Sequence, residues 1–553
     1  MTDTKILQFD TDVRASLLRG VETLALAVQA TLGPSGRNVI LQKKHNALPT
    51  STKDGVSVAK EIKLKDPFEN QGAQILKEAS LKTATHAGDG TTTSTVIAYN
   101  LFKAACESLA NNPTINAILL KREIDNLCQE AVEKIREVSV PVTTSEDIFS
   151  VATVSANNDS QIGQLIASAI EKVGRDGIIY VEEGNTAETQ LELVEGLQFK
   201  RGYASPYFVT NQHKFTTELE DAIIVVTDVA VTSFSQIEAP ANVAMKNGKP
   251  LVIIAEKIGD EALATLVVNK MRGTLKACAV QAPEFGEKRR QILEDIAMAT
   301  GATFLSAQRG TPYPTDVNDW TDAMFGSAKK VIVTKTDTTI VEGNCDKDAI
   351  QKRVNELKEQ LESTSLAPVD KEKIQERLAR LIGGVAIIRV GANTEVEMKE
   401  KRDRIDDAVQ ATKAALEEGI VPGGGKMLLM TRVDPLSRYT PVKLLAVLLF
   451  NQAVAAPLRT ICDNAGISKD EIDNIIKTIT KSGKDTWDGY NLLEDKYCNL
   501  REKGIVDPAK VTRVALENAI SVAGTLMTTA AAVVIDPEES KPQQEIDPAM
   551  FMQ

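Results

Sequence analysis

The sequence has few cysteines and histidines, the residue types that carry most zinc and thiol redox chemistry and many acid–base sites. Its six cysteines are scattered without a CxxC pair, and its three histidines, His45, His86 and His213, show neither metal-ligand nor triad spacing. These absences argue against a zinc site, a redox motif and a histidine-based hydrolase, and unpaired thiols favour a reduced, cytoplasmic setting. Any hydrolysis by this chain would have to rely on carboxylates and a bound metal ion.

Aromatic residues, clustered basic charge and long apolar runs are scarce as well. Aromatics make up only 4% of the chain, so its cores should be aliphatic. A net charge of −12 without a basic stripe argues against nucleic acid as a partner. The longest apolar runs, such as residues 444–450, are too short to cross a bilayer, and residues 1–10 lack the apolar segment of a secretory signal. We therefore expect no membrane partner.

The chain of 553 residues is too long for one core and should form about three or four domains. Apolar periodicity predicts helices near the ends, over 5–32, 67–86, 91–109 and from 397 onward, with short strands at 38–42 and 57–63. Apolar β-type runs in the middle predict strands over 177–182, 222–227, 250–255, 275–280, 330–334 and 385–390. Two charged helices are expected across 349–382, broken at Ala367-Pro368. Gly196 and Gly384 flank this α/β block, which suggests an insertion on two hinges into a discontinuous domain.

The stretch from Ala87 to Val96 organises the rest of the chain. Gly88 and Gly90 separate two helical patterns and let a ligand approach the backbone closely. The threonines that follow would stand at a helix N-terminus, where free N–H groups and the helix dipole favour phosphate. Asp89 adds a hard oxygen ligand of the kind that Mg²⁺ uses beside nucleotide phosphates. The alternative is a tight helix–helix turn with hydroxyl caps.

Other glycine turns could complete a nucleotide site. They are Thr31–Pro34, Thr52–Gly55 and Gly423–Gly425, and Asp407 lies on a helix that could swing toward them. Each of these segments taken alone is more typical of an ordinary turn, cap or surface ion pair. The sequence GxxxxGK[ST] is missing, so this is not an ordinary P-loop ATPase.

Six segments in order resemble the group I chaperonins, the GroEL family, of which this chain looks like a divergent member. They are Thr31–Asn38, Thr52–Ala59, Gly88–Thr93, Glu395–Lys401, Glu417–Gly425 and Val506–Arg513. The resemblance runs from about residue 5 to 537. It implies a multidomain α/β chaperonin fold, with a helical equatorial ATPase domain (1–137 and 418–553), a hinged intermediate domain (138–194 and 386–417) and an α/β apical domain inserted in the chain (195–385).

The resemblance also implies the roles of particular residues. Those that match ATP-binding positions are Thr31, Leu32, Gly33, Pro34, Lys53, Asp89, Gly90, Thr91, Thr92, Thr93, Gly424, Asn491 and Asp507. Asp89 would hold Mg²⁺, and the backbone oxygens of Thr31 and Lys53 would bind K⁺. Asp54 and Asp407 match the hydrolytic carboxylates. Because phosphoryl transfer depends mainly on positioning and charge stabilisation, these groups would suffice without histidine.

The implied function is that of an ATP-dependent chaperone. A homo-oligomeric seven-membered ring, single or double, would capture unfolded proteins on apolar apical surfaces and enclose them, with a possible co-chaperonin lid. Residues expected to bind substrate are Tyr203, Tyr207, Phe208, Ile237, Leu263, Val267 and Val268. Leu263, Val267 and Val268 form one apolar helix face, for which the alternative is plain core packing.

Four departures from the family pattern bear on this reading. Glu238 and Ala241 stand where the family has large apolar residues, and Ser35 replaces its lysine next to Gly36. Residues 463–468 lack the acidic pair that commonly meets the opposite ring, so the number of rings stays open. The tail, 538–553, is polar and acidic, lacks the Gly-Gly-Met repeat, and is expected to be disordered.

Three other functions compete with the folding ATPase. An ATP-switched holdase or scaffold ring for a narrow set of clients is favoured slightly by Glu238 and Ala241. A small-molecule kinase or ATPase would need a polar substrate constellation in the large inserted block, and none is evident. An archaeal-type chaperonin would need an apical insertion for its built-in lid, which the sequence does not show.

Overall fold

The structure is a computed structural model, and the chain divides into two compact units. Unit 1 comprises Met1–Ser168, Glu183–Thr189 and Val390–Gln553, and unit 2 comprises Ala169–Glu182 and Gln190–Arg389. Each unit is described by itself. The residues described are 4–42, 49–175, 177–184, 186–212, 215–362, 374, 377, 378, 381, 384–436, 439–481 and 486–535.

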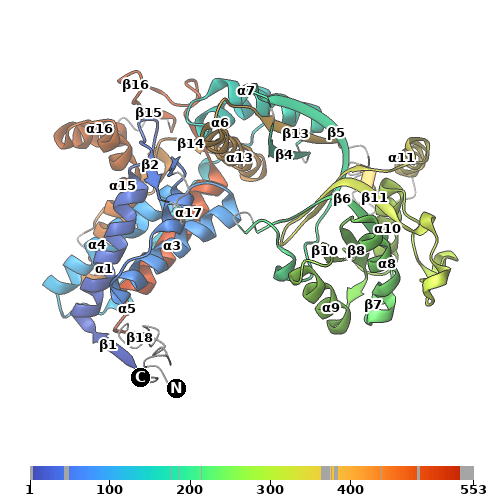
Figure 1. Cartoon of the computed structure of the whole chain (residues 1–553). Helices are drawn as coiled ribbons and strands as arrows, with labels where there is room; N and C mark the ends of the chain where they lie inside the picture. The colour runs from blue at the N-terminus through green and yellow to red at the C-terminus, as the bar shows by residue number, and fades with distance from the viewer. Residues whose placement is uncertain are drawn as a thin grey trace, which may run out of the picture. The chain divides into compact units, whose positions relative to one another are not determined.

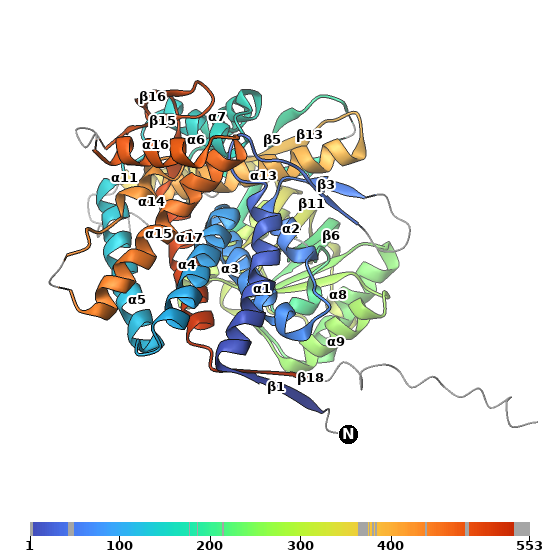
Figure 2. The same cartoon turned by 90° about the vertical axis from the view of Figure 1, so that its left-hand side faces the viewer.

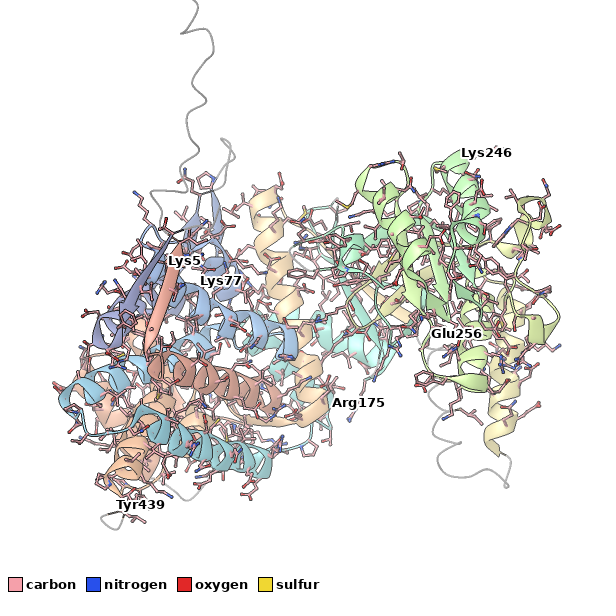
Figure 3. All side chains as sticks on the ribbon, turned by 90° about the horizontal axis from the view of Figure 1, so that it is seen from below. Lys5, Lys77, Arg175, Lys246, Glu256 and Tyr439 are labelled. Atoms are coloured by element: carbon pink, nitrogen blue, oxygen red, sulfur yellow. The ribbon has the colours of Figure 1, made fainter. Side chains whose placement is uncertain are left out.

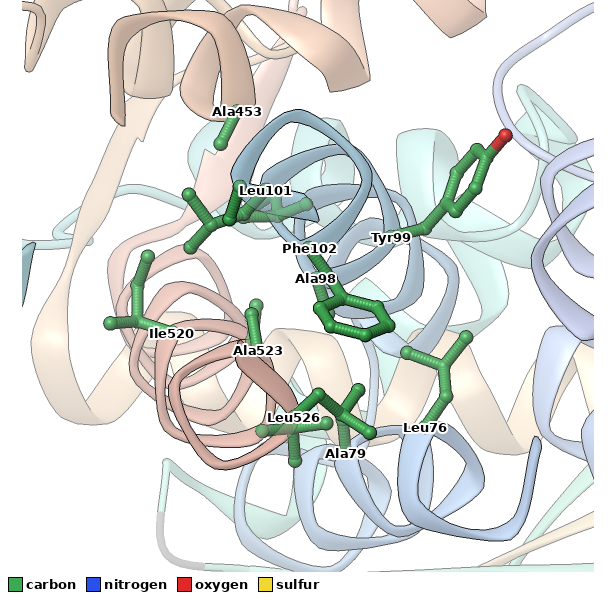
Figure 4. Packing of buried hydrophobic residues seen from close by; sticks show 14 of the residues in the cluster. Leu76, Ala79, Ala98, Tyr99, Leu101, Phe102, Ala453, Ile520, Ala523 and Leu526 are labelled. Carbon is green, nitrogen blue, oxygen red and sulfur yellow. The ribbon is translucent and has the colours of Figure 1, made fainter. Parts of the chain in front are cut away.

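Long helices form the core of unit 1. They are α1 (Asp10–Gln29), α3 (Pro67–Ala87), α4 (Thr91–Asn111), α5 (Ala117–Val138), α15 (Pro441–Asn464) and α17 (Ala509–Met527). Helices α1, α3 and α4 lie side by side, and α17 packs on both α3 and α4 (Figure 2). Aliphatic side chains such as Leu76, Leu101 and Leu526 meet between the helices around Phe102 (Figure 4). The scarcity of aromatics is thus matched by an aliphatic core, as expected.

Two glycines allow α1 and α3 to cross with their backbones in contact. A Cβ at Gly20 would lie 1.7 Å from the carbonyl oxygen of Glu69, and a Cβ at Gly72 would lie 2.2 Å from that of Leu17. Any larger residue at either position would push the two helices apart. The crossing buries Leu17, Val21 and Leu24 of α1 in the core of unit 1.

Two predictions near the N-terminus are wrong. Residues 5–9 belong to strand β1 (Lys5–Phe9), not to the predicted helix 5–32, because they pair antiparallel with β18 (Ala531–Ile535) at the other end of the chain (Figure 3). Residues 57–63 were expected to form a strand, but α2 (Gly55–Glu61) is a helix. Both carboxylate oxygens of Asp54 accept backbone N–H groups at its start, from Val56 and Ser57, each at 2.9 Å. Such a cap favours the helix.

The remaining elements of unit 1 are shorter or lie around the core. The two-stranded antiparallel pairs are β2 (Val39–Leu41) with β3 (Thr50–Thr52), β14 (Ile420–Pro422) with β17 (Val506–Pro508), and β15 (Asp488–Asn491) with β16 (Lys496–Asn499). The helices are α6 (Ser145–Ser155), α13 (Glu395–Glu418), α14 (Lys426–Met430) and α16 (Lys469–Lys481). Helix α7 (Ser160–Val173) follows α6 and passes from unit 1 into unit 2, and strand β4 (Ile178–Glu183) belongs to the sheet of unit 2.

The segment that leaves α5 and the segment that follows α13 lie side by side. Val140 and Ile420 exchange backbone hydrogen bonds of 2.9 and 2.8 Å. Gly419, at φ +83°, lies at this crossing, and a Cβ there would approach the carbonyl oxygen of Val140 to 2.6 Å. The end of α13 is therefore fastened to the chain that leaves α5.

Unit 2 is built on an eight-stranded mixed sheet in the order β10-β8-β6-β11-β12-β5-β13-β4. Its strands after β4 are β5 (Gln190–Phe199), β6 (Thr217–Val226), β8 (Leu251–Ala255), β10 (Ala277–Gln281), β11 (Gly326–Val333), β12 (Thr338–Gly343) and β13 (Gly384–Val390). Strands β6, β8 and β10 are parallel, and every residue of β8 is buried, which is typical of a strand covered on both faces. The predicted strands of the middle block are confirmed.

Helices accompany this sheet (Figure 1). They are α8 (Phe234–Asn247), α9 (Asp260–Met271), α10 (Gly286–Thr300) and α11 (Lys347–Glu362), with a small parallel pair, β7 (Ala230–Val231) and β9 (Lys257–Ile258), and four 3₁₀ turns, η1–η4, between Pro206 and Met324. Helix α11 confirms the first of the two charged helices. The break at Ala367-Pro368, most of the second helix, His45, His213 and the tail 538–553 lie outside the described residues.

Helix α15 is long and apolar enough to cross a membrane by length and composition alone. It is nevertheless a core helix of unit 1: residues along its whole length, from Ala446 to Cys462, are buried against α4, α5 and other elements. Core packing explains its apolar composition.

Candidate nucleotide site

Three loops of unit 1 come together at the N-terminal end of α4. Thr31, at the end of α1, and Thr92, in the first turn of α4, have their hydroxyl oxygens 3.4 Å apart. Gly55 opens α2 beside them, and a Cβ there would lie 2.2 Å from the hydroxyl of Thr92. The predicted segments 31–34, 52–55 and 88–93 therefore form one site.

The N-terminus of α4 has no side-chain cap. Its cap position is Gly90, at φ +83°, and no side chain there accepts a hydrogen bond from the first turn. Thr91 and Thr92 are buried and their backbone N–H groups begin the helix, with Thr93 half-buried next to them. An uncapped helix N-terminus between two glycine turns is suited to phosphate oxygens.

Helix α13 brings Asp407 to this site. The helix packs on Gly88, where a Cβ would lie 2.3 Å from that of Gln410, so only glycine allows this approach. Gln410 is one turn along α13 from Asp407, and α13 also contacts β3 and α3. The hydrolytic carboxylate predicted on α13 thus lies near the predicted phosphate loop.

The carboxylates of Asp54, Asp89, Asp407 and Asp507, called here the carboxylate cluster, act on one another electrostatically. Burial raises the pKa of Asp407 well above its usual value, and the charges of Asp54 and Asp89 raise it further. Burial and Asp54 also raise the pKa of Asp89, against the N–H of Gly90, which donates to its Oδ1 at 2.5 Å. These effects reflect crowded negative charge that a cation would relieve.

Asp507 joins the cluster from the β14–β17 strand pair. It lies in β17, opposite Val421 of β14, and its carboxylate accepts the backbone N–H groups of Gly424 and Gly425. Burial and the charge of Asp89 raise the pKa of Asp507 to about 7, although these two hydrogen bonds lower it. The glycine turn 423–425 is therefore held by hydrogen bonds to Asp507. Asp507 belongs to the same carboxylate cluster as Asp89 of the predicted phosphate loop.

The donor set fits a divalent cation that is shared with phosphate. Among the described residues, no three acidic, histidine or cysteine side chains already form a metal cage. Mg²⁺ commonly binds one or two carboxylates and completes its coordination with phosphate oxygens and water. Asp89, next to the uncapped α4, offers such a carboxylate.

The other predicted nucleotide residues lie in the surrounding loops. Leu32, Gly33 and Pro34 follow α1, and Lys53 stands half-buried between β3 and α2. Asn491 ends β15 and is buried, and its side-chain oxygen accepts the N–H groups of Leu493 and Glu494. No hydrogen bond between described residues links Asn491 to the carboxylate cluster, so its place in the site rests on the family resemblance.

The predicted substrate residues of unit 2 divide into two groups. Tyr207 and Val268 are 65% and 43% exposed, and Tyr203, Leu263 and Val267 are half-buried. Phe208 and Ile237 are a correction, because they are 0% and 1% exposed and belong to the core of unit 2. They cannot contact a bound chain in this structure, whereas exposed Phe234, Met245 and Met271, which the prediction missed, extend the apolar surface of α8 and α9.

Sequence comparison decides the family. The model of the TCP-1/cpn60 chaperonin family matches residues 24–537, nearly the whole chain. This protein belongs to the TCP-1/cpn60 chaperonin family. Its multidomain α/β architecture is the chaperonin fold.

Solved structures with the same fold include the chaperonin gp146 from the bacteriophage EL 2 (Pseudomonas aeruginosa), crystallised in the presence of ATP-BeFx. Its crystal form II matches this chaperonin with a TM-score of 0.66 and 22% identity, over 96% of this chain and 99% of that one. Crystal form I gives a TM-score of 0.58 with the same identity and coverage. At this identity the likeness shows the fold.

The prediction also missed residues of this chaperonin that shape the nucleotide loops without matching a motif. Gln410 packs on Gly88, and Asn464 donates hydrogen bonds to the loop after α1. Both come from segments remote in sequence from the loops they contact. No local pattern could have indicated them.

Proposed function

We propose that this chaperonin binds and hydrolyses ATP in unit 1 and uses the cycle to capture, enclose and release non-native proteins. The observation that carries the proposal is the convergence of Asp54, Asp89 and Asp407 at the uncapped N-terminus of α4. Three acidic residues from three distant segments are costly to hold together without a cation. The Mg²⁺ ion of a bound magnesium nucleotide would supply that positive charge locally.

In the proposed mechanism the chain mainly positions the reactants. The N–H groups at the start of α4 would bind phosphate oxygens, and Asp89 would hold Mg²⁺, which neutralises phosphate charge when bound. The backbone oxygens of Thr31 and Lys53 would hold K⁺. Asp507, with Gly424 and the segments 31–34 and 90–93, would line the rest of the nucleotide site.

Asp54 and Asp407 would orient the attacking water. Asp54 is held rigidly, because its oxygens cap α2 and accept the hydroxyl of Ser57 at 2.7 Å. Burial and the charges of Asp54 and Asp89 raise the pKa of Asp407, and a bound Mg²⁺ would offset the effect of those charges. Since Asp407 lies on α13, hydrolysis would occur only while α13 is packed on Gly88. Movement of α13 into this position would therefore gate the reaction.

The decisive experiment compares phosphate release by the wild type, Asp407→Ala and Asp403→Ala. Asp403 is on the same helix, one turn earlier, and pairs with Arg402. Asp407→Ala should lose about 100-fold or more of the hydrolysis rate while still binding nucleotide, because removing a positioned acid–base group costs this much. Equal rates for the wild type and Asp407→Ala would contradict the assignment, as would equal loss in Asp403→Ala.

We further propose that the exposed apolar surface of α8 and α9 captures non-native chains and the loop of a co-chaperonin. Phe234, Met245, Val268 and Met271 are each more than two-fifths exposed. Repeated around a ring, such weak sites would act together. On this proposal the protein works in the cytoplasm.

The holdase alternative keeps one specific observation in its favour. Glu238 and Ala241 are half-buried on α8, so the middle of that helix adds little apolar area to the surface. A refolding assay separates the two functions: a holdase would suppress aggregation of a denatured enzyme without restoring its activity on addition of ATP.

A further inference from the structure

The C-terminal end of α15 supports the loop that follows α1. The side-chain Nδ2 of Asn464, the last residue of α15, donates to the carbonyl oxygens of Gln29 and Leu32, both at 2.9 Å. Ile461, about one turn earlier, packs on Gly33, where a Cβ would lie 3.0 Å from its side chain. One helix end therefore holds the loop by hydrogen bonds and by packing.

Most backbone carbonyl oxygens of residues 28–33 accept a hydrogen bond from within the protein. The oxygens of Val28, Ala30 and Gly33 accept the N–H groups of Thr31, Arg37 and Gly36 at 3.1, 2.8 and 2.9 Å. The oxygens of Gln29 and Leu32 accept hydrogen bonds from the side-chain amide of Asn464.

The carbonyl oxygen of Thr31 is the exception. Within the described residues no hydrogen-bond donor contacts it. Gly36 lies against this oxygen, and a Cβ at Gly36 would approach it to 2.1 Å. Only glycine fits this closely against the oxygen, and the hydrogen-bonding capacity of the Thr31 carbonyl is left unused by the described residues.

We propose that Asn464 is a positioning residue that sets the conformation of residues 31–34 for a nucleotide and its monovalent cation. By binding the carbonyls of Gln29 and Leu32, Asn464 would hold the loop both before and after Thr31 and so limit the directions that the Thr31 carbonyl can take. This inference rests on the proposed nucleotide function and deepens it. Asn464 would touch neither nucleotide nor cation and would act only through the loop.

Asn451 supplies a matched control on the same helix. It is buried, donates from Nδ2 to the carbonyl oxygen of Val433 at 2.7 Å and accepts the N–H of Val433 at 2.9 Å. Asn451→Ala therefore removes two hydrogen bonds to a loop that lies outside the nucleotide site. Any effect of general destabilisation should appear in this variant as well.

The experiment uses the full chain with Asn464→Ala, Asn464→Asp and Asn451→Ala. Binding of ADP with Mg²⁺ is measured by calorimetry in KCl and in NaCl, and hydrogen exchange is measured over residues 29–37 without nucleotide. Asn464→Ala should weaken ADP binding about tenfold, as loss of two backbone hydrogen bonds at one loop would. It should also lose the preference for K⁺ and speed exchange over 29–37.

Asn464→Asp should be at least as impaired, because it keeps the shape but sets a carboxylate against two carbonyl oxygens. Wild-type binding and exchange in Asn464→Ala would overturn the proposal, as would equal losses in Asn451→Ala. If the wild type binds no ADP, the proposed function fails. In that case hydrogen exchange over residues 29–37 is the only test of the positioning role. An unchanged exchange rate in Asn464→Ala would then overturn the positioning role.

Discussion

At the scale of single residues, the carboxylate cluster combines a stability cost with a functional use. Asp89, Asp407 and Asp507 all have raised pKa values, with burial as the largest cause. The negative charges that oppose ionisation of this cluster would be offset by the Mg²⁺ ion of a bound magnesium nucleotide. We therefore expect the nucleotide-free protein to be sensitive to pH.

Asp507 allows that sensitivity to be tested. Its pKa is about 7 in the folded protein against an ordinary value of 3.8, so the folded state holds a proton that the unfolded state releases. Its contribution to stability is complete below the ordinary value and is lost as the pH rises through about 7. The nucleotide-free wild type should lose stability relative to Asp507→Asn between pH 4 and 7, and the difference should level off above that range.

Thermal melts of the two proteins across this range measure the effect. A difference in melting temperature that stays constant with pH would contradict the raised pKa. Asp507→Asn keeps the size of the side chain and can still accept hydrogen bonds from Gly424 and Gly425. The comparison therefore isolates the charge.

At the scale of elements, α9 separates core packing from binding within one helix. Leu266 and Ala262 are buried, Leu263 and Val267 pack partly on the core of unit 2, and Val268 is exposed. The apolar face predicted from the sequence is thus divided between two roles. Spacing shows that residues share a helix face, but what covers that face depends on the neighbouring elements.

Val268→Asp tests the binding role of this helix. Because Val268 is exposed, the substitution should leave the fold stable but weaken suppression of aggregation of a denatured enzyme severalfold, since a charge opposes apolar capture. Asn247→Asp, which adds the same charge at the exposed end of α8, is the control. Light scattering of the aggregating enzyme measures both. Normal suppression by Val268→Asp would remove α9 from the proposed surface.

At the scale of the whole molecule, exposed apolar residues on two two-stranded ribbons of unit 1 bear on assembly. Ile6, Leu7, Phe9, Val533 and Ile535 are 39–58% exposed on the β1–β18 pair, and Ile40 is 74% exposed on β2. Two-stranded ribbons have free edges on both sides and readily pair with another chain. If the ring of the proposed function forms, these edges are suited to pairing with a neighbouring copy.

Mass in solution tests the assembly. The wild type should form a particle of seven or fourteen subunits, as the family resemblance implies, and Ile40→Asp should dissociate it to smaller species, because a buried unpaired charge is costly at an interface. Phe285→Asp, a change of similar exposure in unit 2, should leave the mass unchanged. A monomeric wild type would sink the enclosure mechanism. A seven-subunit particle would favour a single ring.

The sequence by itself determined the family, the aliphatic core, most helices and strands, and the loops that meet at α4. These depend on local chemistry: glycine turns, apolar periodicity and continuous apolar runs are properties of short segments. Family membership followed from six such segments in order. The domain boundaries and the roles of the individual site residues remain predictions.

The tertiary structure alone decided what depends on a distant partner. Lys5–Phe9 is a strand because β18 pairs with it from the other end of the chain, and Phe208 and Ile237 are buried because helices and strands from other parts of the chain pack around them. The approach of Asp407 to Asp54 and Asp89 requires α13 to pack on Gly88. The contact of Asn464 with a loop more than 400 positions earlier has no local signal, because a hydrogen bond to a backbone carbonyl requires no particular residue type in the loop.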